Sequence, residues 1–136
     1  MKKVLIFGST GSIGTNTLNV IRNFPDKFEV SALAVNTRID ILLPQIEEFH
    51  PKAVVVKSKE FGLKLKRLVG NKYEIFTGTN GLIHVARDLD YDIFVGAMVG
   101  FSGLAPTIEA IKRGKRIALA NKETLVVAGE LITNLQ

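Results

Sequence analysis

The stretch VLIFGSTGSIG, residues 4–14, decides the fold. Four apolar residues are followed by three glycines spaced G-x-x-G-x-x-G, a variant of the dinucleotide-binding fingerprint. A short apolar run of this kind is typical of a strand buried on both faces. We expect Gly8 to allow a tight turn, Gly11 to let a pyrophosphate approach the backbone, and Gly14 to let a helix pack closely on the strand. The helix that follows would offer free N–H groups to phosphate.

The rest of the chain alternates short apolar runs with longer amphipathic stretches. The pattern predicts further strands at 28–35, 53–56, 73–76, 93–95 and 116–120, and helices at 12–23, 40–49, 58–70, 82–89, 104–113 and 121–135. On the first helix we expect Ile13, Val20 and Ile21 to face inward, and we expect Asp40 to cap the second. Strands alternating with helices indicate the α/β class: one doubly wound parallel sheet, a Rossmann-type dinucleotide-binding domain spanning residues 1–136.

Composition narrows the classes of function. The chain has 136 residues, no cysteine and a formal net charge of +5. The lack of cysteine excludes disulfides, thiolate metal sites and cysteine nucleophiles. The charge favours an anionic partner without saying whether it is nucleic acid, a phosphate ligand or a membrane surface. No stretch approaches the length of a transmembrane helix. We expect a cytoplasmic protein that binds a nucleotide, with no nucleic-acid or membrane partner.

The end of the second predicted strand bears on which dinucleotide binds. Domains that bind NAD usually place Asp or Glu there to hold the ribose 2′-hydroxyl. Residues 34–38 contain no carboxylate and end in Asn36, Thr37 and Arg38. Arg38 can pair with a 2′-phosphate, and its two neighbours can donate hydrogen bonds. The alternative is that Arg38 is a solvated residue at a helix start. Because the segment has an arginine and no carboxylate, we predict NADP(H).

Two further loops follow predicted strands and belong to the same candidate site. Ala97 and Met98 follow the strand at 93–95, where small residues suit a loop beneath the nicotinamide ribose. Met98 either touches the nicotinamide ring or packs in the core. Asn121, Lys122 and Glu123 follow the last strand, at the edge of the sheet where ligands of α/β proteins bind.

These segments together resemble the 1-deoxy-D-xylulose 5-phosphate reductoisomerase family. The resemblance is carried by residues 8–14, Gly114-Lys115 and residues 119–126, of which the Asn-Lys-Glu segment is the most specific. It implies contacts of Thr10, Gly11, Ser12 and Ile13 with the pyrophosphate. Asn36, Thr37 and Arg38 would occupy the adenosine-phosphate loop, where many members have Gly-Lys-Asn. Asn121 and Glu123 would contact the nicotinamide end of NADPH, and Lys122 would reach the substrate.

The resemblance also implies a reaction. Members rearrange and reduce a sugar phosphate, 1-deoxy-D-xylulose 5-phosphate, to 2-C-methyl-D-erythritol 4-phosphate, an isoprenoid precursor, with NADPH and a divalent metal, Mg²⁺ or Mn²⁺. Their metal ligands belong to an Asp-Ser-Glu motif and a later Glu, neither of which precedes Gln136. We therefore expect no metal site in this chain, catalytic and carboxyl-terminal domains outside it, no turnover by it alone, and a homodimeric full-length enzyme. His50 and His84 fall on predicted helices away from the site.

Two other functions remain open. One is another NADP-dependent reductase of the aspartate-semialdehyde or dihydrodipicolinate reductase type, which the Asn-Lys-Glu segment disfavours. The other is a stand-alone nucleotide-sensing module without catalysis. Sequence beyond Gln136 would decide between such a module and the reductoisomerase, because an Asp-Ser-Glu motif there indicates the enzyme.

Overall fold

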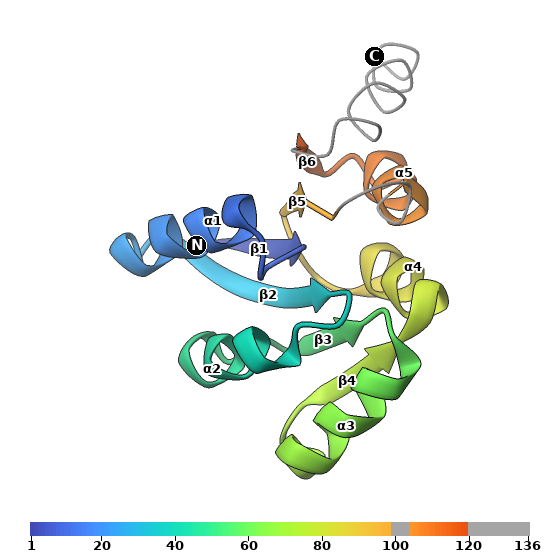
Figure 1. The fold of residues 1–136 in the computed structure, drawn as a ribbon. Helices are drawn as coiled ribbons and strands as arrows, with labels where there is room; N and C mark the ends of the chain where they lie inside the picture. Colours follow the sequence, from blue (N-terminus) through green and yellow to red (C-terminus); the bar gives the residue numbers. More distant parts are fainter. Residues whose placement is uncertain (99–103, 120–136) are drawn as a thin grey trace.

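A computed structural model describes residues 1–98 and 104–119 and contains a parallel sheet of six strands in the order β4-β3-β2-β1-β5-β6 (Figure 1). The strands are β1 (Lys2–Phe7), β2 (Phe28–Val35), β3 (Ala53–Val56), β4 (Glu74–Thr77), β5 (Ile93–Gly96) and β6 (Arg116–Leu119). All the predicted strands are therefore confirmed within the described residues, including the small extra strand β4.

Helices cover both faces of the sheet. They are α1 (Ser12–Asn23), α2 (Ile39–Phe49), α3 (Lys59–Val69), α4 (Gly78–Asp88) and α5 (Leu104–Lys112), with a short 3₁₀ turn η1 (Gly70–Lys72) before β4. Ser58 caps α3 by accepting a hydrogen bond from the N–H of Phe61. Within the ranges that the structure describes, no helix has both the length and the apolar character needed to cross a membrane.

Two separate apolar clusters fill the two layers between sheet and helices. Val4 and Ile6 of β1 join the cluster that contains Leu18, Leu42 and Leu65 of α1, α2 and α3. Leu5 and Phe7 join the other cluster, with residues of α4 and α5 such as Leu82 and Ala110. Successive strand residues point to opposite faces, so β1 to β5 each supply residues to both cores. This three-layer arrangement confirms the doubly wound α/β class.

The order of the strands reverses beside β1. The chain builds outward from β1 to β4 and then crosses back, so that β5 pairs with β1 on its other side. At the carboxyl end of β1, Phe7 is in register with Ala34 of β2 and with Gly96 of β5. Open α/β sheets bind ligands at such a reversal, outside the carboxyl ends of the strands.

Two of the predictions for the first helix are wrong. Ile21 is buried as expected, but Ile13 and Val20 are 46% and 50% exposed. The buried residues of α1 are Gly14, Leu18 and Ile21, which follow one another at spacings of four and three. Because Gly14 must lie against the turn that follows β1, it fixes the rotation of the helix and turns Ile13 and Val20 outward.

The predicted cap of the second helix is also wrong. Arg38 occupies the N-cap position of α2, and no side chain caps the helix there. Asp40 lies within the first turn, where a carboxylate still interacts favourably with the amino end of the helix.

Candidate nucleotide-binding site

The glycine loop is fixed against both neighbouring strands. Gly8 has φ +99°, a conformation that side chains rarely allow. Its N–H and that of Ser9 donate to the carbonyl oxygen of Ala34, at 2.7 and 3.2 Å. A Cβ on Gly8 would lie 2.6 Å from the carbonyl carbon and oxygen of Ala97. The turn therefore brings the end of β1 against the residue that follows β5.

The other two glycines of the motif differ in the space around them. A Cβ on Gly14 would lie 2.1 Å from the carbonyl oxygen of Gly8 and 2.6 Å from Cα of Ser9. Close packing of helix on loop thus requires Gly14. A Cβ on Gly11 would meet only the Gly8 oxygen, at 3.8 Å, and its φ of −81° suits any residue. Nothing in the described chain requires glycine at position 11, whereas a ligand approaching the backbone there would.

The amino end of α1 is available for an anion. Gly11 is the N-cap and supplies no side-chain cap, and the first turn contains no acidic residue. The N–H of Thr15 donates to the Gly11 carbonyl at 2.9 Å, which leaves the earlier N–H groups of the helix without partners inside it. Ser12 and Ile13 are exposed, and Thr10 is half-buried. Free N–H groups and the helix dipole favour a phosphate at this point.

The predicted adenosine-phosphate loop lies on the surface after β2. Asn36, Thr37 and Arg38 are all exposed. The N–H of Ser58 donates to the carbonyl of Asn36 at 3.0 Å and ties this loop to the one after β3. Arg38 donates through Nε and Nη2 to the two carboxylate oxygens of Asp40, both at 3.1 Å. These hydrogen bonds lower the pKa of Asp40 and raise the pKa of Arg38.

The Arg38–Asp40 pair bears on the prediction of NADP(H). An arginine against the positive end of a helix is mildly unfavourable unless an anion lies nearby. Asp40 supplies that anion from within the chain, two residues beyond the segment inspected for carboxylates. Arg38 remains exposed, and any anionic ligand that pairs with it must compete with Asp40.

The loop after β5 begins with Ala97, whose backbone contacts the glycine turn, and Met98, whose side chain is buried. The N–H of Ala97 donates to the carbonyl of Phe7 at 2.7 Å, so this loop begins beside the glycine turn. Met98 is 3% exposed and belongs to the apolar cluster beneath α4 and α5. Asn121, Lys122 and Glu123 lie outside the described residues; β6 ends at Leu119, in register with Gly96 of β5.

Sequence reasoning missed one residue of this edge. Gln45 of α2 donates through Nε2 to the carbonyl oxygen of Ser9 at 2.9 Å. A glutamine in the middle of an amphipathic helix carries no motif that would single it out.

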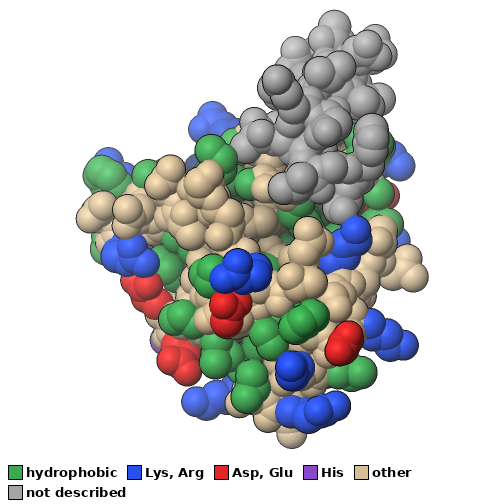
Figure 2. Space-filling model, viewed as in Figure 1, with side chains coloured by type: hydrophobic (Ala, Val, Ile, Leu, Met, Phe, Trp, Pro, Cys, Tyr) green, Lys and Arg blue, Asp and Glu red, His purple; other side chains and the backbone are tan. Residues whose placement is uncertain are grey.

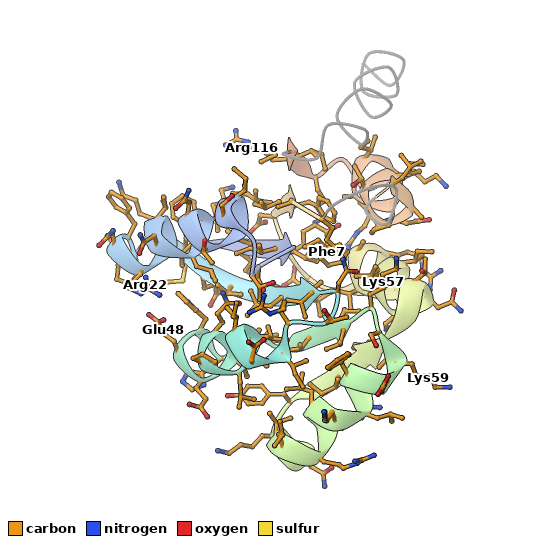
Figure 3. The ribbon with its side chains drawn as sticks, in the orientation of Figure 1. Phe7, Arg22, Glu48, Lys57, Lys59 and Arg116 are labelled. Carbon is orange, nitrogen blue, oxygen red and sulfur yellow. The ribbon has the colours of Figure 1, made fainter. Side chains whose placement is uncertain are left out.

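Figure 3 shows how side chains fill the space between α2 and the sheet. Arg22 of α1 and Glu48 of α2 face each other, and Lys57 lies just beyond β3.

The two histidines lie elsewhere, as expected. Nδ1 of His50 is 3.1 Å from the hydroxyl of Tyr73, and Nδ1 of His84 is 3.0 Å from the carboxylate of Asp88. His50 follows the carboxyl end of α2 rather than lying within the helix. On the face shown in Figure 2, Lys and Arg side chains are interspersed with Asp and Glu.

The fold and the glycine cradle define a class: Rossmann-type domains, which bind nucleotides at the point where the strand order reverses. Comparison with known proteins narrows the class. The family model described as 1-deoxy-D-xylulose 5-phosphate reductoisomerase matches residues 4–129. The chain belongs to the 1-deoxy-D-xylulose 5-phosphate reductoisomerase family.

Individual relatives agree with this assignment. The reductoisomerase of Chloroherpeton thalassium is 47% identical in an alignment of 136 positions that covers 99% of this chain and 35% of the relative. A crystal structure of DOX-P reductoisomerase with NADPH, fosmidomycin and magnesium superposes with a TM-score of 0.90 at 40% identity, covering 98% of this chain and 33% of that one. The Zymomonas mobilis enzyme in complex with NADPH gives 0.88 at 35% identity, covering 98% and 35%. This chain thus spans about a third of the length of its relatives.

Proposed function

We propose that this chain binds NADPH along the sheet edge formed by the loops after β1, β2 and β5, as part of an enzyme that isomerises and reduces 1-deoxy-D-xylulose 5-phosphate to 2-C-methyl-D-erythritol 4-phosphate. The observation that carries the proposal is Gly11. Its missing side chain leaves open a place that no atom of the described chain fills, beside the uncapped amino end of α1. A pyrophosphate fits that place by charge and by shape.

The proposed contacts follow the geometry of the edge. Backbone N–H groups of Thr10, Ser12 and Ile13, with the hydroxyls of Thr10 and Ser12, would bind the pyrophosphate beside Gly11. Arg38, with Asn36 and Thr37, would hold the 2′-phosphate, because a planar guanidinium pairs with two phosphate oxygens at once.

The nicotinamide end of the cofactor would lie near the loops after β5 and β6. Ala97 begins the loop after β5, against Gly8, and Met98 lies beneath it in the core. From the family resemblance, Asn121 and Glu123 would lie near the nicotinamide, and Lys122 would contact the sugar phosphate substrate. When bound, NADPH supplies the hydride that reduces the rearranged aldehyde.

The divalent metal of the family has no counterpart among the described residues. In residues 1–98 and 104–119 no group of three or more His, Cys, Asp or Glu side chains is arranged to hold a metal ion. We therefore assign no step of metal chemistry to them. We propose that residues 1–136 serve as the NADP(H)-binding domain and that Mg²⁺ or Mn²⁺ is held by residues outside this sequence. Assembly into a homodimer and a cytoplasmic location are further parts of this proposal.

Mapping the bound cofactor tests the proposed site. Amide signals of the ¹⁵N-labelled chain should shift on addition of NADPH at residues 8–14, 36–38 and 97–98, and should stay unchanged at the opposite edge of the sheet, at the amino ends of the strands such as Lys2, Phe28 and Glu74. Shifts confined to that opposite edge would contradict the site.

Assigning catalysis to other residues needs a separate assay. NADPH absorbance is followed with the chain, 1-deoxy-D-xylulose 5-phosphate and Mg²⁺. We expect no oxidation, because rearrangement needs several carboxylates converging on one ion. Metal-dependent oxidation by the verified 136-residue chain would overturn the proposed division into domains.

A further inference from the structure

Gln45 is held in a contact that the nucleotide motif does not account for. Its amide reaches across from α2, and Nε2 donates to the carbonyl oxygen of Ser9 at 2.9 Å. Ser9 is fully buried in the middle of the glycine loop, 36 residues away along the chain. We propose that Gln45 is a positioning residue for the cofactor: it orients the peptide between Ser9 and Thr10 so that the loop presents an N–H group to the pyrophosphate. The inference rests on the proposed function.

The planarity of the peptide bond carries the first step. In a trans peptide, the C=O of one residue and the N–H of the next point in opposite directions. Gln45 fixes the Ser9 carbonyl toward α2, so the N–H of Thr10 points away from α2. Within the described residues no acceptor is recorded for that N–H, although Gly8, Ser9 and Gly11 all donate to backbone carbonyls. The orientation therefore leaves Thr10 with a donor for a ligand.

The second step concerns the polar atoms around this contact. The amide must donate through Nε2, because the opposite orientation would set Oε1 against another acceptor, the Ser9 carbonyl. Oε1 of Gln45 and Oγ of Ser9 are then both buried without a hydrogen-bond partner in the described part of the chain. Buried unpaired polar atoms lower stability. Gln45 leaves its Oε1 unpaired while its Nε2 holds the carbonyl of Ser9. A role in function explains this arrangement better than a contribution to stability.

The position of Gln45 on α2 supports the same conclusion. Arg38 is the N-cap of this helix, and Gln45 lies seven residues further on, which is about two turns and therefore on the same side. One helix thus carries the guanidinium proposed for the 2′-phosphate and the amide that orients the pyrophosphate loop. α2 would fix the spacing between the two phosphate subsites.

The experiment compares Gln45→Met with wild type and with Glu47→Met, the same new side chain at an exposed position of the same helix. Methionine keeps the length of the side chain but removes the donor, which lowers stability. It also removes the unpaired Oε1, which raises stability, so the two effects oppose each other. We expect a melting temperature close to that of wild type but a Kd for NADP⁺ about tenfold higher, the loss typical of a misplaced charge-assisted hydrogen bond. Glu47→Met should change neither quantity.

A pH profile of Gln45→Glu excludes a purely structural role. The ionised carboxylate repels the Ser9 carbonyl, whereas the protonated acid can donate to it as the amide does. The ratio of the Kd of this variant to that of wild type should be largest near pH 8. It should fall toward one as the pH drops through the pKa of a partly buried glutamate, above about 4.3.

The outcomes separate the two proposals. Wild-type binding with an unchanged Kd in Gln45→Met, or a Kd that rises only together with a lower melting temperature, overturns the role of Gln45 alone. A pH-independent Kd ratio for Gln45→Glu does the same. Failure of the wild-type chain to bind NADP⁺ at any pH overturns the proposed function, and the role of Gln45 with it.

Discussion

The loops after β1 and β2 end side by side at one edge of the sheet, but they are held in different ways. The glycine loop is fixed by hydrogen bonds to Ala34, by contact with Ala97 and by the amide of Gln45. The loop after β2 exposes all three of its predicted ligand-binding residues, and among the described residues Arg38 forms its ion pair with the exposed Asp40. A rigid loop suits the pyrophosphate that all dinucleotides share, whereas an exposed loop suits the group that distinguishes one dinucleotide from another.

The largest effect should come from the glycine that the fold itself requires. In Gly14→Ala the new Cβ meets the Gly8 carbonyl at 2.1 Å, so α1 must move away from the strand end. Overpacking against backbone costs roughly 3 kcal/mol or more, and we expect the melting temperature to fall by about 10 °C. Circular dichroism measures it. Gly11→Ala is the matched control and should melt at or slightly above the wild-type temperature; equal losses in the two variants would show that the glycines do not differ.

Gly11→Val should separate binding from folding. The backbone at position 11 is extended, and the described chain leaves space for a side chain, so the fold should persist. A branched Cβ would stand where the pyrophosphate approaches, and we expect affinity for both NADPH and NADH to fall by at least about 100-fold. Fluorescence titration of each cofactor measures the loss. A folded variant that binds NADPH normally would show that the glycine loop is not the phosphate site.

Arg38→Ala should affect one cofactor only. Removing the guanidinium removes a charge-assisted pair with the 2′-phosphate, worth about 1.5–3 kcal/mol, so the Kd for NADPH should rise by roughly 10- to 100-fold. The Kd for NADH should stay the same, because NADH has a hydroxyl at that position. Loss of affinity for both cofactors by the same factor would assign Arg38 a structural role instead.

The smallest effect is expected at Asp40. Its carboxylate competes with the 2′-phosphate for Arg38 and repels it, so Asp40→Asn should tighten NADPH binding several-fold at low ionic strength. The gain should shrink as salt is added, since the side chains of both residues are exposed. Weaker NADPH binding in Asp40→Asn would indicate that the carboxylate holds Arg38 in place rather than competing for it.

The sequence predicted the fold almost completely, because apolar periodicity and glycine spacing are local signals. It failed where a tertiary contact decides the outcome. Ile13 and Val20 are apolar and helical, but the packing of Gly14 against Gly8 rotates them toward solvent. The Arg38–Asp40 pair depends on where α2 begins, and the boundaries of helices are poorly specified by propensity.

Only part of the candidate site could be predicted from the sequence. The glycine loop and Ala97 meet as expected, since parallel strands bring their carboxyl ends together. Met98 was left between two roles, and its burial places it in the core without testing contact with a cofactor. Gln45 could not be found from the sequence, because its role depends on a carbonyl 36 residues away.

The most direct test of the central claim is calorimetric titration of the wild-type chain with NADPH and with NADH under the same conditions. The account predicts one site per chain and a Kd at least about tenfold lower for NADPH, a difference of about 1.4 kcal/mol from the 2′-phosphate. Absence of binding, or an NADH affinity equal to or higher than that of NADPH, would contradict it.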